Sequence, residues 1–484
     1  MRKITKDARM DHQPSRFRHQ AGYVAFVAFM ALCLIGGGGS RADMQSLPFV
    51  RLGAILLTAF MLLWAGQGSL RRVRTPLILL ALFALLMIIQ LIPLPPALWM
   101  GLPGHAGYSQ LAEAAGIDQP WRPISITPDL TLNSLLALAI PAAALVTLAL
   151  LPRESTFKVL PLLIAGALSS ALIGVAQMSG DAGKDLYLYR ITNFSAPVGF
   201  FANRNHQAAF LAMGIPMLAL WAASLRGDPR KLLALRWTAF GAALFIVALG
   251  LATGSRMGVV LQLLGMAGAF ALLRVRRGST DVQTGKGRQC ILIGAGVSMV
   301  LILGGAMIAR SRAESIQRLF ASDSGEDLRF AYISYTVDLA GKFFPFGSGF
   351  GSFDAVFREV EPRAQLGWAF FNHAHNDLIE LAMNGGIFAL GLLAVFLLWW
   401  FRQALRLWRG GSKSRSADLG RLGSILTAML MLSSLVDYPL RTPTMALIFA
   451  ISCFWMCGSS GSSEAREPRD RNEADDSAGP RFTR

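Results

Sequence analysis

Long apolar runs recur along this chain and are separated by shorter polar segments. Each run has about 18 or more largely apolar residues, enough for a helix to cross the roughly 30 Å hydrocarbon layer of a bilayer. By hydropathy the pattern predicts about 12 transmembrane helices. These helices are expected to begin near Ala21, Leu47, Thr75, Leu130, Phe157, Ala208, Trp237, Gly258, Cys290, Leu378, Leu419 and Thr442.

Composition supports this interpretation and excludes a soluble domain. Hydrophobic residues make up 53% of the chain and charged residues only 15%. The first apolar run lacks a convincing small-residue cleavage site, so we interpret it as a retained helix and not as a signal peptide. We expect a basic N-terminus at 1–20, a transmembrane domain at 21–457 and a polar, disordered tail at 458–484.

Basic residues indicate the orientation of the helices. They gather at 2–18, 71–74, 226–236, 274–288 and 402–421, and all five clusters fall on one side if the count of helices is right. The positive-inside rule assigns that side to the cytoplasm, which also makes both termini cytoplasmic. The clusters account for most of the net charge of +17, so the charge does not indicate nucleic-acid binding.

The opposite face carries three long loops, at 93–128, 179–205 and 310–372. The third loop contains both acidic and basic residues, and its segment 329–340 has apolar residues at helical spacing, which predicts an amphipathic helix. Because this face carries the long loops, chemistry is expected here.

The segment from Phe371 to Asp377 is the strongest candidate for chemistry. It places His373, His375, Asn376 and Asp377 at the mouth of a long apolar run, where polar groups are costly. An imidazole that titrates near neutral pH is a suitable general base, and Asn376 or Asp377 could fix its tautomer. A helix N-cap would need only one of these residues, so we favour a catalytic function.

Two further elements lie on the same face. Arg190 is followed by Asn203, Arg204 and Asn205 at the start of an apolar helix, where amides and cations favour an anion; a polar cap at the membrane interface explains the same residues. Arg256 follows a tight Thr253-Gly254-Ser255 connection and suits a phosphate group, although an arginine that extends to the interface remains an alternative.

Metal and cysteine chemistry is not expected. Cys33, Cys290, Cys453 and Cys457 all lie in apolar runs, where reduced core thiols are the ordinary case. His373 and His375 could hold zinc only with a third ligand, which the nearby sequence does not supply. The glycine-rich run from Gly347 to Gly351 lacks the strand and helix of a nucleotide-binding loop and is interpreted as a turn. We therefore predict no metal and no cofactor.

Taken together, these motifs resemble the O-antigen ligase and polymerase superfamily over about 190–391. The resemblance rests on Phe201-x-Asn203-x-Asn205-x-x-Ala208, on Ser255-Arg256-x-Gly258, on Arg329 followed by the glycine run, and on His375-Asn376-x9-Gly386. Two positions depart from it: Ala389 stands where ligases often have a second glycine, and His373 is additional.

The resemblance implies an all-α, GT-C-like membrane bundle with a large periplasmic loop between helices 9 and 10. It also implies a metal-independent inverting glycosyltransferase in the bacterial inner membrane, active on the periplasmic face. In this family His375 would be the base for the acceptor hydroxyl, and Arg256 with Arg190 or Arg204 would hold the diphosphate. The remaining residues would have supporting roles: Asn203, Asn205, Arg329, His373, Asn376 and Asp377.

The implied donor is a glycan on undecaprenyl diphosphate, drawn from the surrounding membrane lipid. The acceptor would be lipid A core for a ligase, or a growing lipid-linked glycan for a polymerase of O-antigen or exopolysaccharide. The spacing from His375 to Gly386 favours a ligase. A transporter for bicarbonate or another small anion is the alternative from another class, but its polar groups would lie deep within the spans, whereas here they gather at one face.

Overall fold

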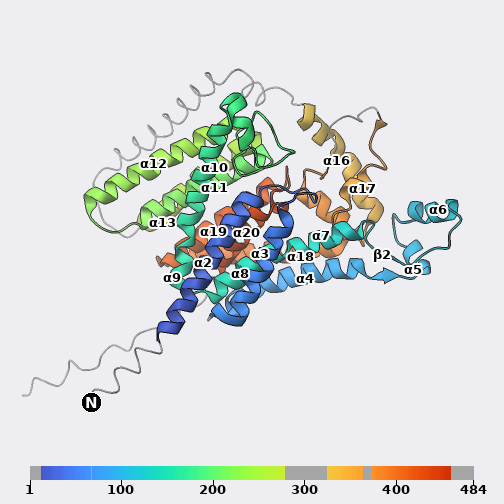
Figure 1. Ribbon diagram of the computed structural model, residues 1–484, viewed down its shortest axis with the longest axis horizontal. Helices are drawn as coiled ribbons and strands as arrows, with labels where there is room; N and C mark the ends of the chain where they lie inside the picture. Colours follow the sequence, from blue (N-terminus) through green and yellow to red (C-terminus); the bar gives the residue numbers. More distant parts are fainter. Residues whose placement is uncertain (1–11, 67, 278–323, 364–371, 459–484) are drawn as a thin grey trace, which may run out of the picture.

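The computed structural model describes residues 12–66, 68–277, 324–363 and 372–458, and these form a helical bundle (Figure 1). Within those ranges nine segments are long and apolar enough to cross a membrane. They are built from α2 (His12–Gly36), α3 (Leu47–Phe60) with the π-helical turn Met61–Ala65, a 3-10 turn (Leu70–Val73) with α4 (Arg74–Leu91), α7 (Pro128–Ala137) with α8 (Ala139–Leu150), α9 (Arg153–Phe157) with α10 (Val159–Gln177), α11 (Arg204–Ser224), α12 (Pro229–Ala252), α13 (Arg256–Arg277) and α18 (Asp377–Arg409).

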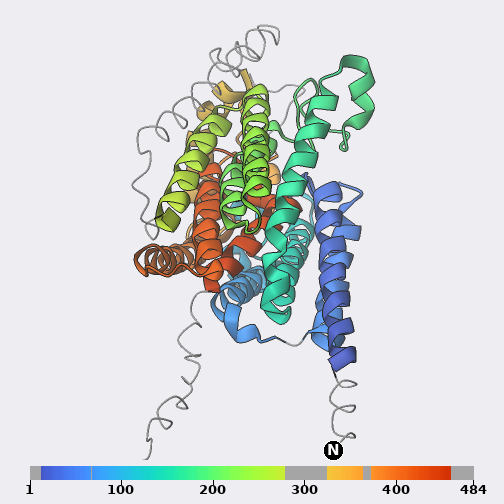
Figure 2. The ribbon, with the colours of Figure 1, turned by 90° about the vertical axis from the view of Figure 1, so that its left-hand side faces the viewer.

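Two more helices lie at the centre of the bundle, α19 (Arg415–Ser433) and α20 (Pro443–Cys457) (Figures 1 and 2). Most residues of both helices are buried. The connections carry the shorter elements: β1 (Pro93–Leu94), α5 (Pro96–Met100), α6 (Ala106–Ala114), β2 (Arg122–Pro123), α16 (Ser324–Phe343), α17 (Phe353–Phe357) and 3-10 turns at Gly180–Leu186 and Pro439–Arg441. β1 and β2 pair antiparallel, with Pro93 opposite Pro123.

The structure confirms a polytopic helical protein, and nine of the predicted spans correspond to the nine apolar segments. The span predicted near Leu419 is α19, which carries Arg415, Asp418 and Arg421 in its first two turns. The span near Thr442 is α20, which has only 15 residues. The span predicted at Cys290 lies outside the described residues, as do 1–11 and 459–484.

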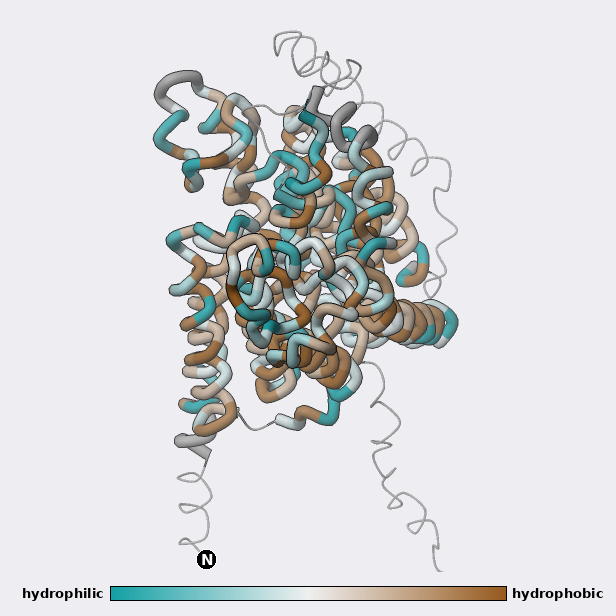
Figure 3. Tube along the Cα trace, turned by 90° about the vertical axis from the view of Figure 1, so that its right-hand side faces the viewer, coloured by the Kyte–Doolittle hydropathy of each residue, from teal (hydrophilic) through white to brown (hydrophobic). Residues whose placement is uncertain are grey.

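Two ends of the bundle differ in chemistry. At one end, here called the basic end, Arg276 and Arg421 both pair with Asp418, and the Arg18 guanidinium lies 5.6 Å from the ring of Trp64. Buried Arg421 also donates to the carbonyls of Leu407 and Ser412, at 3.0 and 2.7 Å. Basic residues from distant parts of the chain therefore meet at the same end, in keeping with the predicted clustering. Figure 3 shows apolar colour along the helices and polar colour gathered in loops and at helix ends.

The predicted amphipathic helix at 329–340 is confirmed as part of α16, which packs against α18. After α16 the glycine run turns back toward α18, as expected for a turn. Ser348 N and Gly349 N donate to the carbonyls of Met383 and Asn384 at 2.9 and 3.0 Å, and Ile387 N donates to Pro345 O at 3.0 Å. A kink in α18 leaves some of its backbone groups without hydrogen-bond partners inside the helix. The turn supplies partners for these groups.

That kink is at Gly386, whose φ of 56° and ψ of −148° are not helical. This region of backbone space is essentially restricted to glycine. A Cβ at Gly386 would lie 1.9 Å from the carbonyl oxygen of Pro345, which is backbone and cannot rotate away. The close approach of the two segments therefore requires glycine, and the kink sets the direction of the helix start that bears His375.

Gly386→Ala is expected to destabilise the protein by roughly 2–4 kcal/mol, because it adds backbone strain to a steric clash. Gly391→Ala is the matched control: Gly391 lies in the same helix, and a Cβ there meets nothing within 4 Å. Thermal unfolding of the two purified variants in detergent, followed by size-exclusion chromatography, measures the difference. Equal melting temperatures would contradict this account of the kink.

Candidate active site

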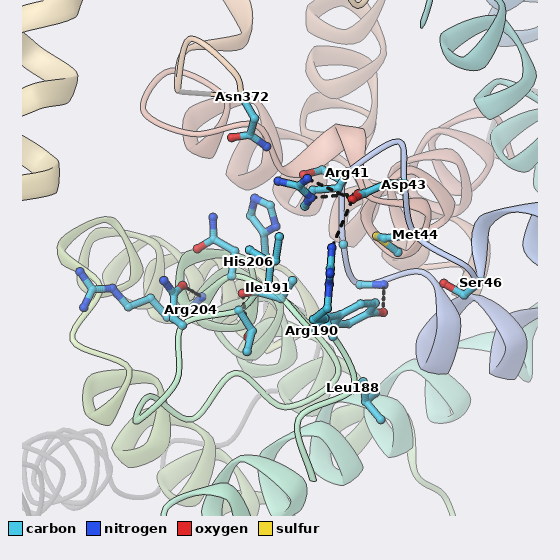
Figure 4. A pocket seen from close by; sticks show the side chains of 18 of the residues that line it. Arg41, Asp43, Met44, Ser46, Leu188, Arg190, Ile191, Arg204, His206 and Asn372 are labelled. Atoms are coloured by element: carbon cyan, nitrogen blue, oxygen red, sulfur yellow. Dashed lines mark hydrogen bonds and ion pairs between the residues drawn. The ribbon is translucent and has the colours of Figure 1, made fainter. Parts of the chain in front are cut away.

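A cavity of about 1530 Å³ opens at the end of the bundle opposite the basic end. Its walls come from the loop between α2 and α3, the segment 188–194, the start of α11, and three single residues from the C-terminal part of the chain, Asn372, His375 and Tyr438. Figure 4 shows labelled side chains of the first three walls facing one space. Residues distant in sequence thus share one site, here called the cavity.

The α2–α3 loop is held close to the start of α11 by glycines. A Cβ on Gly38 would lie 1.9 Å from the carbonyl oxygen of Phe200, and Gly38 O accepts from Ala202 N at 3.1 Å. Tyr189 lies beneath this loop: its hydroxyl accepts from Gly38 N at 2.6 Å and donates to Ile35 O at 3.3 Å. Burial raises the pKa of Tyr189 to about 12, so the hydroxyl keeps its proton.

Asp437, in the turn between α19 and α20, is the acceptor at the centre of the site. Its side chain is 1% exposed. Its Oδ2 accepts from Asn205 Nδ2 at 2.8 Å and from Asn203 Nδ2 at 3.3 Å. Its Oδ1 lies 3.3 Å from His375 Nδ1 and 3.9 Å from His206 Nε2. A buried carboxylate is costly unless it is hydrogen-bonded, and here the two asparagine amides supply hydrogen bonds while the two imidazoles lie close by.

His375 sits between this carboxylate and the cavity. Its side chain is 13% exposed and lines the cavity, with Nδ1 turned to Asp437. Its φ is +49°, a left-handed conformation that is uncommon outside glycine, although asparagine, aspartate and histidine adopt it more often than other residues do. The Tyr438 ring packs against it, with centroids 4.8 Å apart. The arrangement of a carboxylate, an imidazole and open space beyond it is typical of a general base.

A second buried network lies behind His375. His373 Nδ1 is 3.2 Å from Glu380 Oε1, and Glu380 Oε2 accepts from Ala374 N at 2.9 Å. Arg441 bridges two carboxylates, with Nη2 3.1 Å from Glu380 and Nε 3.1 Å from Asp377. The network pins the 373–377 turn to the 437–441 turn, and so holds the His375 backbone in its strained conformation.

Electrostatics separate the two histidines. Burial lowers the pKa of His373, more than the neighbouring Glu380 raises it, so His373 is neutral near pH 7. Burial alone would lower the pKa of Arg441, but Glu380 and Asp377 outweigh it and raise that pKa.

His373 and His375 point Nδ1 at different carboxylates, which is not the geometry of a shared metal. The described residues contain no group of three or more His, Cys, Asp or Glu side chains that could hold a metal ion.

The predicted supporting residues have defined positions. Asn376 is the N-cap of α18 and accepts from the Leu378 and Ile379 amides at 3.0 and 3.1 Å. Asn203 caps α11 in the same way, through Asn205 N at 2.8 Å. Both asparagines therefore cap helices, and both also contact other parts of the site: Asn376 donates to Leu435 O and Asn203 donates to Asp437. The expectation that Asn376 or Asp377 orients His375 is not what the structure shows, because Asp437 occupies that position.

Three arginines line the cavity: Arg41, Arg190 and Arg204. Arg190 points toward Arg41 and Asp43, whereas Arg204 points away from them (Figure 4). Arg41 binds Asp43 through two hydrogen bonds of 2.9 and 3.0 Å, and the hydrogen bond from Arg41 lowers the pKa of Asp43, which therefore stays ionised. The lining of one cavity thus combines arginines with a histidine.

Arg256 is exposed at the start of α13 and is not among the residues that line the cavity in the described ranges. The Gly258 backbone packs so closely on Ala208 that a Cβ at Gly258 would lie 2.6 Å from the Cβ of Ala208. Arg256 therefore lies at the same end of the bundle as the start of α11. Arg329 lies in α16, and its side chain is outside the described residues.

Six residues of this site lie outside the motifs recognised in the sequence: Arg41, Asp43, Glu380, Asp437, Tyr438 and Arg441. Asp437 and Arg441 carry the same signal as His375, since both are charged residues in a short turn between two apolar runs. Arg41 and Asp43 had a weaker signal, a glycine run of four residues ahead of them at Gly36–Gly39.

Comparison with known proteins finds a family match for part of the chain. Residues 240–394 match the family model described as O-Antigen ligase. The matched range contains Arg256 and His375 and ends before Asp437. No curated protein matches the chain. Nine apolar segments in the described residues make the chain a multi-pass membrane protein, and its segment 240–394 is similar to the O-antigen ligase family.

Proposed function

We propose that this protein transfers a glycan from undecaprenyl diphosphate to an acceptor hydroxyl on the periplasmic face of the inner membrane, with both termini in the cytoplasm. One observation carries the proposal: His375, backed by buried Asp437, lines a cavity whose other wall bears arginines. A base and an anion-binding wall are the two components that this chemistry needs.

In the proposed reaction His375 removes the proton from the acceptor hydroxyl. Because its Nδ1 faces Asp437, we assign the proton transfer to the other ring nitrogen, Nε2. The hydroxyl oxygen attacks the anomeric carbon, and the bond from that carbon to the phosphate oxygen breaks. The electron pair leaves with undecaprenyl diphosphate, and direct attack inverts the anomeric centre. Asp437 stabilises the imidazolium that forms.

The leaving diphosphate gains negative charge as the bond breaks. Arginine grips phosphate oxygens in two places and keeps its proton at all relevant pH values. Arg190 and Arg204 lie on the cavity wall, and Arg256 lies at the same end of the bundle, so we assign all three to the diphosphate. In this proposal they stabilise charge as a metal ion does in other glycosyltransferases, and the reaction requires no metal.

The acceptor distinguishes a ligase from a polymerase. We propose a ligase that delivers finished glycan to lipid A core or a similar acceptor, on the spacing of His375-Asn376 and Gly386. The kink at Gly386 supports an argument from this spacing, because it sets the direction of the start of α18, which directly follows His375 and Asn376. A polymerase of lipid-linked repeat units would use the same donor and the same base.

Deletion of the gene tests the proposal. We expect long glycan to accumulate on the lipid carrier while lipid A core stays bare, measured by extracting both and comparing chain lengths. Single repeat units on the carrier would instead assign a polymerase. No change in either pool, together with altered uptake of bicarbonate or another small anion, would contradict the proposed function and favour a transporter.

A further inference from the structure

The loop between α2 and α3 contributes a charged pair that the motifs of the family resemblance do not include. Asp43 Oδ2 accepts from Arg41 Nη2 at 3.0 Å and lies 4.0 Å from Arg190 Nη2. One carboxylate oxygen is therefore shared by guanidinium groups from two different loops. Figure 4 shows Arg190 directed from the 188–194 segment to this pair.

The position of this pair is fixed by the fold. The backbone contacts of Gly38 with Phe200 and Ala202, and the hydroxyl of Tyr189, join the two loops. Ser46 Oγ closes the other end of the loop by donating to Gly36 O at 2.6 Å. The two loops that carry Arg41 and Arg190 are thus held near each other by contacts that do not involve Asp43, so the fold itself places two arginines at one site.

An oxygen anion between two arginines is also the arrangement that phosphate oxygens adopt in proteins. Arg190 is 86% exposed and Asp43 is 52% exposed, so the carboxylate can turn into solvent at little cost. Arg41 is less exposed, at 29%, and stays in the wall.

We propose that Arg41 and Arg190 together bind the diphosphate of the donor, and that Asp43 is an internal anion that competes for the same site until the donor arrives. This inference rests on the proposed function and adds to it a residue, Arg41, and a competing group. Asp43 keeps the arginines paired when no donor is present, and displacement of its carboxylate accompanies diphosphate binding. The ligand class is an organic or inorganic diphosphate.

Binding to the purified full-length protein in detergent tests the inference. Farnesyl diphosphate and inorganic pyrophosphate are titrated by calorimetry into wild type and variants. Asp43→Asn is expected to tighten binding by about fivefold, the scale of one half-exposed ion pair. Arg41→Gln is expected to weaken it by about tenfold, since a charge-assisted contact is lost. Asp43→Ser, with a smaller side chain, should change affinity in the same direction as Asp43→Asn.

The direction of the Asp43 effect is decisive. If Asp43 only holds Arg41 in place, Asp43→Asn weakens binding, and the inference is wrong; unchanged affinity for both ligands is equally contrary to it. Tighter binding of both ligands supports recognition of the diphosphate itself, and tighter binding of farnesyl diphosphate alone supports a site that also requires the lipid. Glu359→Gln is the matched control, because it neutralises a carboxylate paired with Lys342 at 3.2 Å outside the cavity.

The binding assay separates this inference from the proposed function. A protein that transfers glycan only when His375 is intact, yet binds diphosphate equally well with Asp43→Asn, would refute the competing anion and leave the function standing. Transfer that persists in His375→Ala would refute the catalytic mechanism, whatever the affinities show.

Discussion

His375→Ala is expected to abolish detectable glycan transfer while the protein still inserts and folds. General bases contribute about 10²- to 10⁴-fold to rate, and here the lost imidazole lines the cavity and lies 3.3 Å from the Asp437 carboxylate. The measurement is the glycan profile of a deletion strain complemented with the variant, with membrane abundance checked by immunoblot.

Two comparisons make this result specific. His375→Gln keeps a polar side chain of similar length but cannot take up a proton, so it should be as inactive as His375→Ala. His19→Ala removes a histidine from α2 near the basic end and should keep wild-type transfer. Normal glycan on the acceptor in a well-expressed His375→Ala strain would rule out the proposed base.

Asp437→Asn is expected to lower the transfer rate by about 10²-fold, because the amide cannot stabilise the imidazolium that forms during attack. The amide also replaces an acceptor that binds Asn203 and Asn205, so part of its hydrogen bonding is lost. Transfer by purified protein in proteoliposomes, with saturating donor, measures the effect on the catalytic step.

A merely structural role for Asp437 would give a different pattern. If Asp437 positions His375, Asp437→Asn should lower the transfer rate with little change in the KM for the donor. An unchanged transfer rate with a lower melting temperature would assign Asp437 to folding alone.

Much of the fold was predictable from the sequence because the bilayer imposes a simple rule. Helices that face lipid must be long and apolar, and all nine candidate spans in the described residues were located from hydropathy. The rule fails for helices shielded by others. α19 can hold Asp418 and Arg421 because both are buried against partners, and α20 can be short because neighbouring helices surround it.

The site was predictable only where polar residues adjoin one another in sequence. His375 and Arg190 stood out because a membrane protein places few such groups at the ends of its spans. Asp437 lies beside His375, more than 60 positions away in sequence, and Arg41 lies near Arg190, more than 140 positions away. No local pattern links such positions. The sequence offered a helix N-cap in this segment, which Asn376 forms, but it could not show that another residue lies beside His375 Nδ1.

Glycan transfer by the purified protein is the measurement that tests the central claim most directly. Proteoliposomes containing the wild-type protein, a glycan on undecaprenyl diphosphate and lipid A core should yield glycan on the core and free undecaprenyl diphosphate in equal amounts. The His375→Ala protein should yield neither. Transfer that is equal in the two proteins, or the absence of transfer by wild-type protein that still binds donor and acceptor, would contradict the account.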